Sequence, residues 1–228
     1  MTDLKQAIKS AVNYAATRTP LPPDIIMGLS ALRNVKAAEI SDISATYHDA
    51  ITQILIDYFE GGGSVVGPSN AMKRACSDAF NDASDAGWVD GGAELPIDGD
   101  ALKQINARTQ EEFGNIDSLF QQAKDLRKQD GFDYFSWATA RADGYTSTVL
   151  YIYNMAALLA KKNQMLEWHL GNAEDHCSTC EKLDGQAHRA SWYISHDYIP
   201  RKPGAAMDCH GYNCQCWLTD RDGNEVTL

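Results

Sequence analysis

The sequence predicts a mainly α-helical protein: long helices followed by a small C-terminal module with short β-strands, stapled by a metal ion. Two observations lead to this prediction. Between residues 40 and 161, apolar residues recur every three or four positions over long stretches, the period of an amphipathic helix. Five of the six cysteines then lie between residues 177 and 216, among short runs, turns and aromatic residues.

Composition and charge narrow the possible partners. The chain has 228 residues, 44% of them hydrophobic, which suits one good-sized domain or one domain with a small appended module. The net charge of −11 argues against strong nucleic-acid binding, because phosphate binding needs a basic face. The N-terminus lacks the apolar region of a signal peptide, and the longest uncharged run, Gly144 to Ala160, is too short and polar to span a bilayer. We therefore expect a soluble protein with no membrane partner.

The long helical patterns end at Asn163 and are followed by short runs, turns, aromatic residues and cysteines. This change in the sequence pattern predicts two domains. Residues 1–163 form the expected helical domain, with an N-terminal arm at 1–23, and residues 164–228 form the expected metal-binding module. Helical spacing in the arm ends at three prolines, Pro20, Pro22 and Pro23, which predict a stiff connector. Such an arm could lie on a neighbouring subunit or pack on its own domain, and both interpretations stay open.

Four long helices are expected in order. The first runs from about Ile40 to the glycines at 61–63, which lack the Lys-Ser/Thr of a phosphate-binding loop. The second opens at Pro68 and ends near Ala86, where the glycines at 87–92 are expected to break it. The third begins near Ala101, with an apolar face made by Leu102, Ile105, Phe113, Ile116, Phe120 and Ala123. The fourth runs from about Tyr134 to Lys161 and is apolar all round, which predicts burial on more than one side.

Three short strands are expected in the C-terminal module. Residues 165–171 alternate loosely in polarity, and residues 192–199 are rich in aromatic and β-branched side chains, which favours a strand or hairpin. Trp217 and Leu218 follow the last cysteine and are expected to pair back as a final strand.

The cysteine spacing predicts the metal site. Cys177-Ser-Thr-Cys180 is a C-x2-C knuckle, whose tight turn brings two thiolates to one point, and Zn²⁺ takes four such ligands in a tetrahedron. The other ligands are expected from Cys209, Cys214 and Cys216. Which two of these bind, or whether His210 replaces one, stays open. A closed four-ligand site is structural, because catalysis needs an open position. The isolated Cys76 is interpreted as a buried apolar side chain.

The C-terminal quarter resembles the phage head morphogenesis family, the minor head proteins related to the F protein of phage Mu and the gp7 protein of phage SPP1. The match covers about residues 130 to 218, and the more N-terminal residues agree only in being helical. In the sequence printed above, the matching pattern consists of Trp168, Asp175-His-Cys177-Ser-Thr-Cys180, Leu183-Asp-Gly185, Ile199-Pro200, Pro203-Gly204, Cys209 and Asn213-Cys214-Gln-Cys216-Trp-Leu218. Gln215 stands where the family usually has Arg, and Cys209-His210 occupies the place of its His.

The resemblance implies a virion protein assembled in the host cytoplasm. Members of the family are non-catalytic structural components that associate with the portal, the head–tail connector or other capsid proteins, as rings or bound to rings. This implies a structural zinc and a homo-oligomeric or ring-associated state for the present chain.

Two other functions share the metal site. A metal-dependent nuclease of the ββα type with a structural zinc is suggested only by Asp175-His176 and by His210 with Asn213. Such a nuclease needs a helix after its last motif that carries a metal-binding His or Asn, and none of the twelve residues after Cys216 is His. A zinc-ribbon adaptor that binds another protein would be monomeric or dimeric, whereas a connector component would form a ring or bind one. We expect no enzymatic activity.

Overall fold

The computed structural model describes residues 40–173, 175–202, 204–211 and 214–226. Every described residue belongs to one compact unit, Ala38–Leu228. The arm expected at residues 1–23 lies outside the described residues, and the expected boundary at residue 163 stays a prediction.

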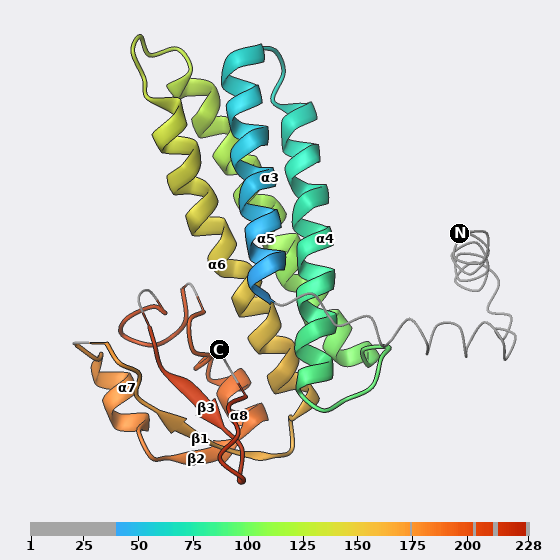
Figure 1. The fold of residues 1–228 in the computed structure, drawn as a ribbon, viewed down its shortest axis with the longest axis vertical. Coiled ribbons are helices and arrows are strands. Elements are labelled where there is room, and N and C mark those ends of the chain that lie inside the picture. Colours follow the sequence, from blue (N-terminus) through green and yellow to red (C-terminus); the bar gives the residue numbers. More distant parts are fainter. Residues whose placement is uncertain (1–39, 174, 203, 212–213, 227–228) are drawn as a thin grey trace, which may run out of the picture. The chain divides into compact units, whose positions relative to one another are not determined.

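Four long helices dominate the described residues, as predicted: α3 (Ile40–Gly61), α4 (Val66–Asp90), α5 (Gly99–Leu126) and α6 (Tyr134–Ala160). Helix α6 packs against all of the other three, most extensively against α4 and α3 (Figure 1). The expectation that α6 is buried on more than one side is confirmed, since thirteen of its residues are buried. Among the described residues, no helix combines the length and apolar character needed to cross a lipid bilayer.

Side-chain caps explain where α5 and α6 begin. The Asp98 carboxylate accepts a hydrogen bond from the Ala101 amide at 2.8 Å, and Asp133 accepts one from the Ser136 amide at 3.1 Å. Each satisfies an amide that has no partner within the helix. The apolar stripe of α5 is centred on Ala101, Ile105 and Ile116, so Leu102 points about 100° away from it and is 40% exposed, contrary to the expected face.

Helix α4 continues four residues past its predicted end at Ala86. Gly87 lies inside the helix, where a Cβ atom would stand 2.2 Å from the Tyr153 carbonyl oxygen of α6. Gly91, at the end of α4, shows the same close approach, since a Cβ there would stand 2.8 Å from the Ala157 carbonyl oxygen. These glycines let two helix backbones touch, and the first of them does not end the helix.

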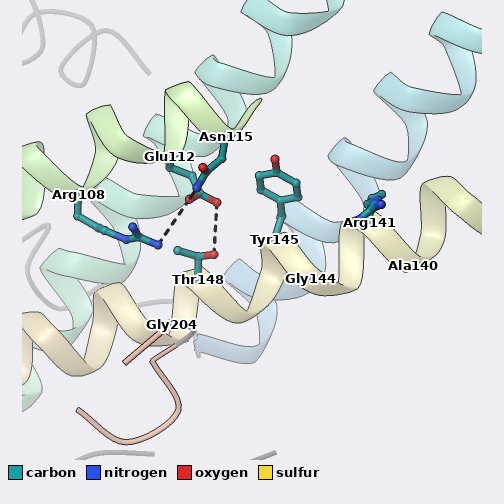
Figure 2. Close-up of a pocket in the computed structure, with 9 residues that line it drawn as sticks. All are labelled: Arg108, Glu112, Asn115, Ala140, Arg141, Gly144, Tyr145, Thr148 and Gly204. Carbon is teal, nitrogen blue, oxygen red and sulfur yellow. Dashed lines mark hydrogen bonds and ion pairs between the residues drawn. The ribbon is translucent and has the colours of Figure 1, made fainter. Parts of the chain in front are cut away.

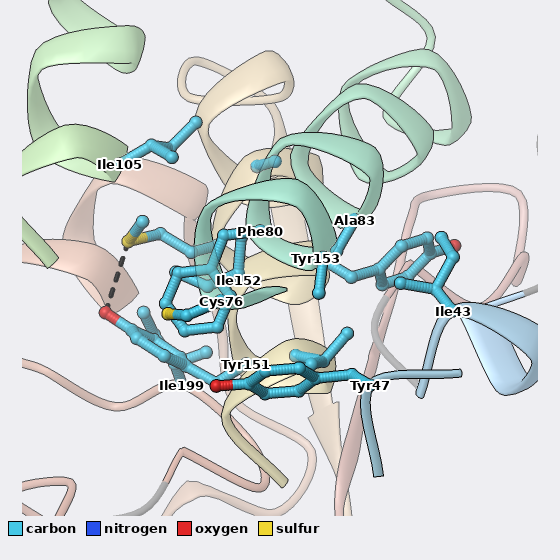
Figure 3. Close-up of a cluster of buried hydrophobic side chains, with 14 of the residues drawn as sticks. Ile43, Tyr47, Cys76, Phe80, Ala83, Ile105, Tyr151, Ile152, Tyr153 and Ile199 are labelled. Atoms are coloured by element: carbon cyan, nitrogen blue, oxygen red, sulfur yellow. Dashed lines mark hydrogen bonds between the residues drawn. The ribbon is translucent and has the colours of Figure 1, made fainter. Parts of the chain in front are cut away.

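The core joins the helices and the C-terminal module. Figure 3 shows Tyr47, Phe80 and Ile152 from three helices meeting side chains such as Ile199 from the module. Tyr47 and Phe80 pack edge to face, with ring centroids 6.4 Å apart. Cys76 is fully buried in this core, as expected for an isolated cysteine.

A three-stranded antiparallel sheet underlies the module, in the order β2-β1-β3. It comprises β1 (Met165–His169), β2 (Ala187–Arg189) and β3 (Trp217–Thr219). Trp168 pairs with Leu218, and both are fully buried. The expected strands at 165–171 and 217–218 are thereby confirmed, whereas the sequence does not predict β2.

The strand or hairpin expected at 192–199 is wrong. Residues Ala190–Ser195 form the short helix α8, which packs against α6. The packing of Tyr193 explains why this segment is a helix. Its ring is fully buried, and its hydroxyl donates to the carbonyl oxygens of Leu166 and Gln186 at 3.2 and 3.0 Å. Tertiary packing therefore overrides the strand propensity of Trp192, Tyr193 and Ile194.

Candidate metal centre

The C-x2-C knuckle sits at the start of the short helix α7 (Ser178–Leu183). Cys177 is the extended residue before the helix, and its sulfur accepts the Cys180 amide hydrogen at 3.5 Å. The two sulfurs are 3.3 Å apart. Cys180 is 2% exposed and Cys177 is half-buried, so one thiol faces the interior and the other lies near the surface.

The other three cysteines come from an irregular segment that leads into β3. Two close backbone contacts position it. At Gly211, whose φ is +72°, a Cβ would stand 1.9 Å from the Lys202 carbonyl oxygen. At Gly171, just after β1, a Cβ would stand 2.1 Å from the Gln215 carbonyl oxygen. The absence of side chains at both positions lets the segment carrying Cys209, Cys214 and Cys216 approach the knuckle.

The five sulfurs form two overlapping trios. Cys177, Cys180 and Cys209 make one trio, and Cys180, Cys214 and Cys216 make the other, with the sulfurs of each trio within 4.8 Å of one another. Cys180 belongs to both. All five predicted candidates are thus gathered in one cluster, which could hold a metal ion.

The neighbouring sulfurs shift the pKa values of the thiols in opposite directions. Hydrogen bonds from Cys180 and Cys216 lower the pKa of the Cys214 thiol, helped by the backbone amide of Arg201. Hydrogen bonds from Cys180 to Cys214 and Cys216 raise the pKa of the Cys180 thiol. Burial raises the pKa of Cys209. A metal ion would displace protons from these thiols, because metal ligation requires deprotonated thiolates.

Three polar residues at the cluster were not singled out from the sequence. Ser178 donates a short hydrogen bond to the Asp208 carboxylate, and the Asp208 amide donates to the Thr179 hydroxyl at 3.3 Å. These bonds join the knuckle to the residue before Cys209, and they lower the pKa of Asp208. Ser178 and Thr179 fill the two positions inside C-x2-C, a signal that spacing alone does not interpret.

Helix α6 holds the loop beside the cluster. The Asn154 side chain is fully buried, and its amide donates to the Pro200 carbonyl at 3.5 Å. Lys202 lies over the Tyr151 ring, 5.3 Å from its centroid, and pairs with Asp197. Arg201, whose amide points at Cys214, lies between these two anchors. The bundle therefore fixes part of the metal site.

The two histidines beside the cysteines have different positions. The Nδ1 atom of His176 lies 3.9 Å from the Cys216 sulfur. His210 has a positive φ of 50°, and its Nδ1 lies 3.4 Å from the Ala205 carbonyl oxygen. Among the described residues, the groups close enough to hold a metal contain cysteines alone. His210 is outside both trios.

A second polar site lies between α5 and α6. Figure 2 shows Arg108, Asn115 and Thr148 around the carboxylate of Glu112, which is 3% exposed, beside a cleft of about 310 Å³. Asn115 donates to this carboxylate at 2.9 Å, and Thr148 at 3.4 Å. An Arg108 nitrogen lies 3.6 Å away. The buried charge is compensated within the protein, so the group cross-links two helices.

Comparison with known proteins gives no relative: no family model, no curated protein and no solved structure matches the chain.

Proposed function

We propose that the five-cysteine cluster is a structural zinc centre and that the protein is a non-catalytic structural component of a bacteriophage head or connector. The observation that carries the metal proposal is the convergence of five sulfurs from residues 177–180 and 209–216. Thiolate clusters select zinc or other soft metals over Mg²⁺ and Ca²⁺, and C-x2-C knuckles are typical of structural zinc. The donor set therefore fits Zn²⁺.

The small size of the module explains why it needs a metal. Its regular structure comprises strands of three to five residues and two six-residue helices. Its large buried aliphatic side chains are few: Leu166, Leu183, Ile199, Leu218 and Val226. A structural zinc contributes on the order of 10 kcal/mol to a unit of this kind, which offsets the cost of ordering its long loops.

The virion role rests on the resemblance described above, and the module's packing supports it. Residues of that pattern make up the module's interior: Trp168, Leu183, Ile199 and Leu218 are all buried. Gly185 has a φ of +69°, which explains a glycine at that place in the pattern. In this role the helices and the stapled module contact portal, connector or capsid proteins, and the chain assembles in the host cytoplasm as a homo-oligomer or on a ring.

Local structure does not favour the nuclease alternative. A ββα-type enzyme places a metal-binding helix after its last motif, whereas β3 is followed by a turn at Asp220–Asn224 and a bridge between Thr219 and Glu225. Of the residues that suggested this activity, His210 is in contact with a backbone carbonyl.

Metal analysis tests the zinc centre. Protein purified without chelator is measured by inductively coupled plasma mass spectrometry, as wild type and as the Cys177→Ser, Cys214→Ser and Cys76→Ser variants. We expect zinc in the wild type, reduced zinc in the two cluster variants, and full zinc in Cys76→Ser, which removes a thiol from the helical core. Wild-type protein without metal would overturn the proposal.

Solution assembly and DNA cleavage test the virion role against its alternatives. Mass photometry of the purified protein, alone and with a phage portal ring, should show a ring or a complex with the ring. A protein that stays monomeric or dimeric in both conditions would favour the adaptor. Cleavage of DNA in the presence of Mg²⁺, Mn²⁺ or Ni²⁺, abolished by His210→Ala, would favour the nuclease.

A further inference from the structure

The arrangement of the five sulfurs differs from that of a single zinc site. With Zn–S distances near 2.3 Å, the four sulfurs of a tetrahedral site are all about 3.8 Å from one another. Here the sulfurs separate into two trios, and among the described residues no set of four is mutually within 4.8 Å. Cys177 and Cys209 group with Cys180 in one trio, and Cys214 and Cys216 group with it in the other.

We propose that the cluster binds two metal ions, bridged by the Cys180 thiolate. The first ion is bound by Cys177, Cys180 and Cys209, and the second by Cys180, Cys214 and Cys216. This inference rests on the proposed zinc centre and gives it a stoichiometry and a ligand set. It assigns a place to every cysteine of the cluster, whereas a single four-ligand site leaves one thiol over.

Burial supports the bridging role of Cys180. Its sulfur is the one shared by both trios, and the residue is 2% exposed. Its sulfur interacts with those of Cys177, Cys214 and Cys216. A bridging thiolate must bind two metals, and the Cys180 sulfur belongs to both trios.

Charge supports a second ion. Zinc carries two positive charges and each thiolate one negative charge. One ion bound by four thiolates leaves two negative charges uncompensated, with the fifth cysteine a neutral thiol, whereas two ions bound by five thiolates leave one. Uncompensated buried charge is costly. The chain as a whole is already strongly acidic, which adds to that cost.

His176 lies beside the second trio, although its ring nitrogens are not within 4.8 Å of all three of its sulfurs. Its Nδ1 lies 3.9 Å from the Cys216 sulfur, close to the roughly 3.6 Å that separates a nitrogen and a sulfur ligand on one tetrahedral zinc. Cys177 and Cys209 are partly exposed, so these two members of the first trio lie nearer the solvent than Cys180 and Cys216 do.

Native mass spectrometry of the full chain measures the stoichiometry directly. The protein is kept reduced, loaded with Zn²⁺ and freed of excess metal by gel filtration. We expect two zinc ions per chain. One ion per chain would overturn the bridged pair while leaving the single structural zinc intact, and no bound ion would overturn both proposals.

Variants locate the two ions. Cys209→Ser should retain one ion per chain, because it damages only the first trio, and Cys180→Ser should retain none, because it damages both. Cys76→Ser, the control thiol in the helical core, should retain two. Two ions surviving in Cys180→Ser would place a metal elsewhere and contradict the bridge.

Cadmium provides a readout that does not depend on a variant's folding. Wild-type protein loaded with ¹¹³Cd should give two NMR resonances with a cadmium–cadmium coupling through the shared sulfur. In His176→Ala one resonance should shift, while His188→Ala, on β2, should leave both unchanged. A single wild-type resonance, or two without coupling, would overturn the bridge.

Discussion

At Gly211 the backbone between Cys209 and Cys214 touches the loop that carries Arg201. A Cβ there would lie 1.9 Å from the Lys202 carbonyl oxygen, and the φ of +72° is itself unfavourable for any other residue. The cysteines are therefore brought together by a contact that has no room for a side chain. At this scale the metal site depends on a residue that cannot bind metal.

We expect Gly211→Ala to weaken metal binding by tenfold or more, because Ala would force the segment away from Lys202. Gly223→Ala is the matched control: its φ is +80°, but nothing lies within 4 Å of a Cβ there. The control carries only the backbone cost, about 1 kcal/mol. Competition with a chromophoric chelator measures both affinities, and equal losses in the two variants would contradict the packing argument.

Helices α4 and α6 pack together through a similar close approach, here between their two backbones. Gly87 of α4 lies against the Tyr153 carbonyl of α6, and the Tyr153 hydroxyl donates to Asp90 at 2.7 Å, so one residue of α6 holds α4 at two points. Between α4 and α5, Asp117 accepts from Ser69 at 2.9 Å and pairs with Lys73 at 2.6 Å. These contacts set the spacing of the helices.

Two helical glycines should respond oppositely to alanine. Gly87→Ala should destabilise the bundle by more than about 2 kcal/mol, because it puts a Cβ 2.2 Å from a backbone oxygen. Gly114→Ala, at a position in α5 with nothing within 4 Å, should stabilise it by up to about 1 kcal/mol through helix propensity. Thermal melts followed by circular dichroism at 222 nm give the sign, and stabilisation by both would disprove the close approach.

The cap of α5 should make part of the stability depend on pH. The Ala101 amide hydrogen bond, aided by Lys162, lowers the pKa of Asp98 in the folded protein below its unfolded value of about 3.9. The cap's contribution is therefore present above that value and is lost as the pH falls through the folded pKa. Asp98→Ala should cost about 1 kcal/mol at neutral pH.

Asp98→Asn separates the charge from the cap, because Asn caps nearly as well and does not titrate. The wild type should be at least as stable as this variant at about pH 7, and its stability relative to the variant should fall near pH 3. Comparing the two at each pH removes the effect of metal loss, which is common to both. A stability difference that does not change with pH would contradict the assignment of Asp98 as a charged cap.

At the scale of the whole molecule, the helices and the metal module differ in what stabilises them. The helices share a core of large apolar side chains, including Tyr47, Phe80 and Ile152. The module depends on a few aliphatic residues, Trp168 and Tyr193, and on its cysteine cluster. Asn154, which holds Pro200, connects the two.

Chelation should therefore unfold the module first. We expect excess EDTA to leave most of the ellipticity at 222 nm, because α3 to α6 contain most of the helical residues. The near-UV signals of Trp168, Trp192 and Trp217 should be lost, while those of Trp88 and Trp137 in the helices remain. Selective Trp→Phe variants assign the signals, and a near-UV spectrum unaffected by EDTA would contradict the metal's structural role.

Much of the fold followed from local patterns. The spacing of apolar residues predicted α3, α5 and α6 nearly to their ends, because helix periodicity is a property of neighbouring residues. The end of α4 could not be predicted, since the same glycine that ends a helix also permits close packing, and only Tyr153 distinguishes the two. Likewise, α8 carries strand-forming side chains, and the burial of Tyr193 against β1 overrides them.

The sequence by itself determined the helical class, the C-terminal position of the module and the five cysteines as candidate ligands, because periodicity and C-x2-C spacing are local signals. The tertiary structure alone decided how these cysteines group: two trios of sulfurs that share Cys180, with His210 outside both. The spacing of the cysteines along the chain shows only which ligands are neighbours in the sequence. The distances between Cys177, Cys209 and Cys216 depend instead on how β1, α7 and the loop beneath α6 pack together.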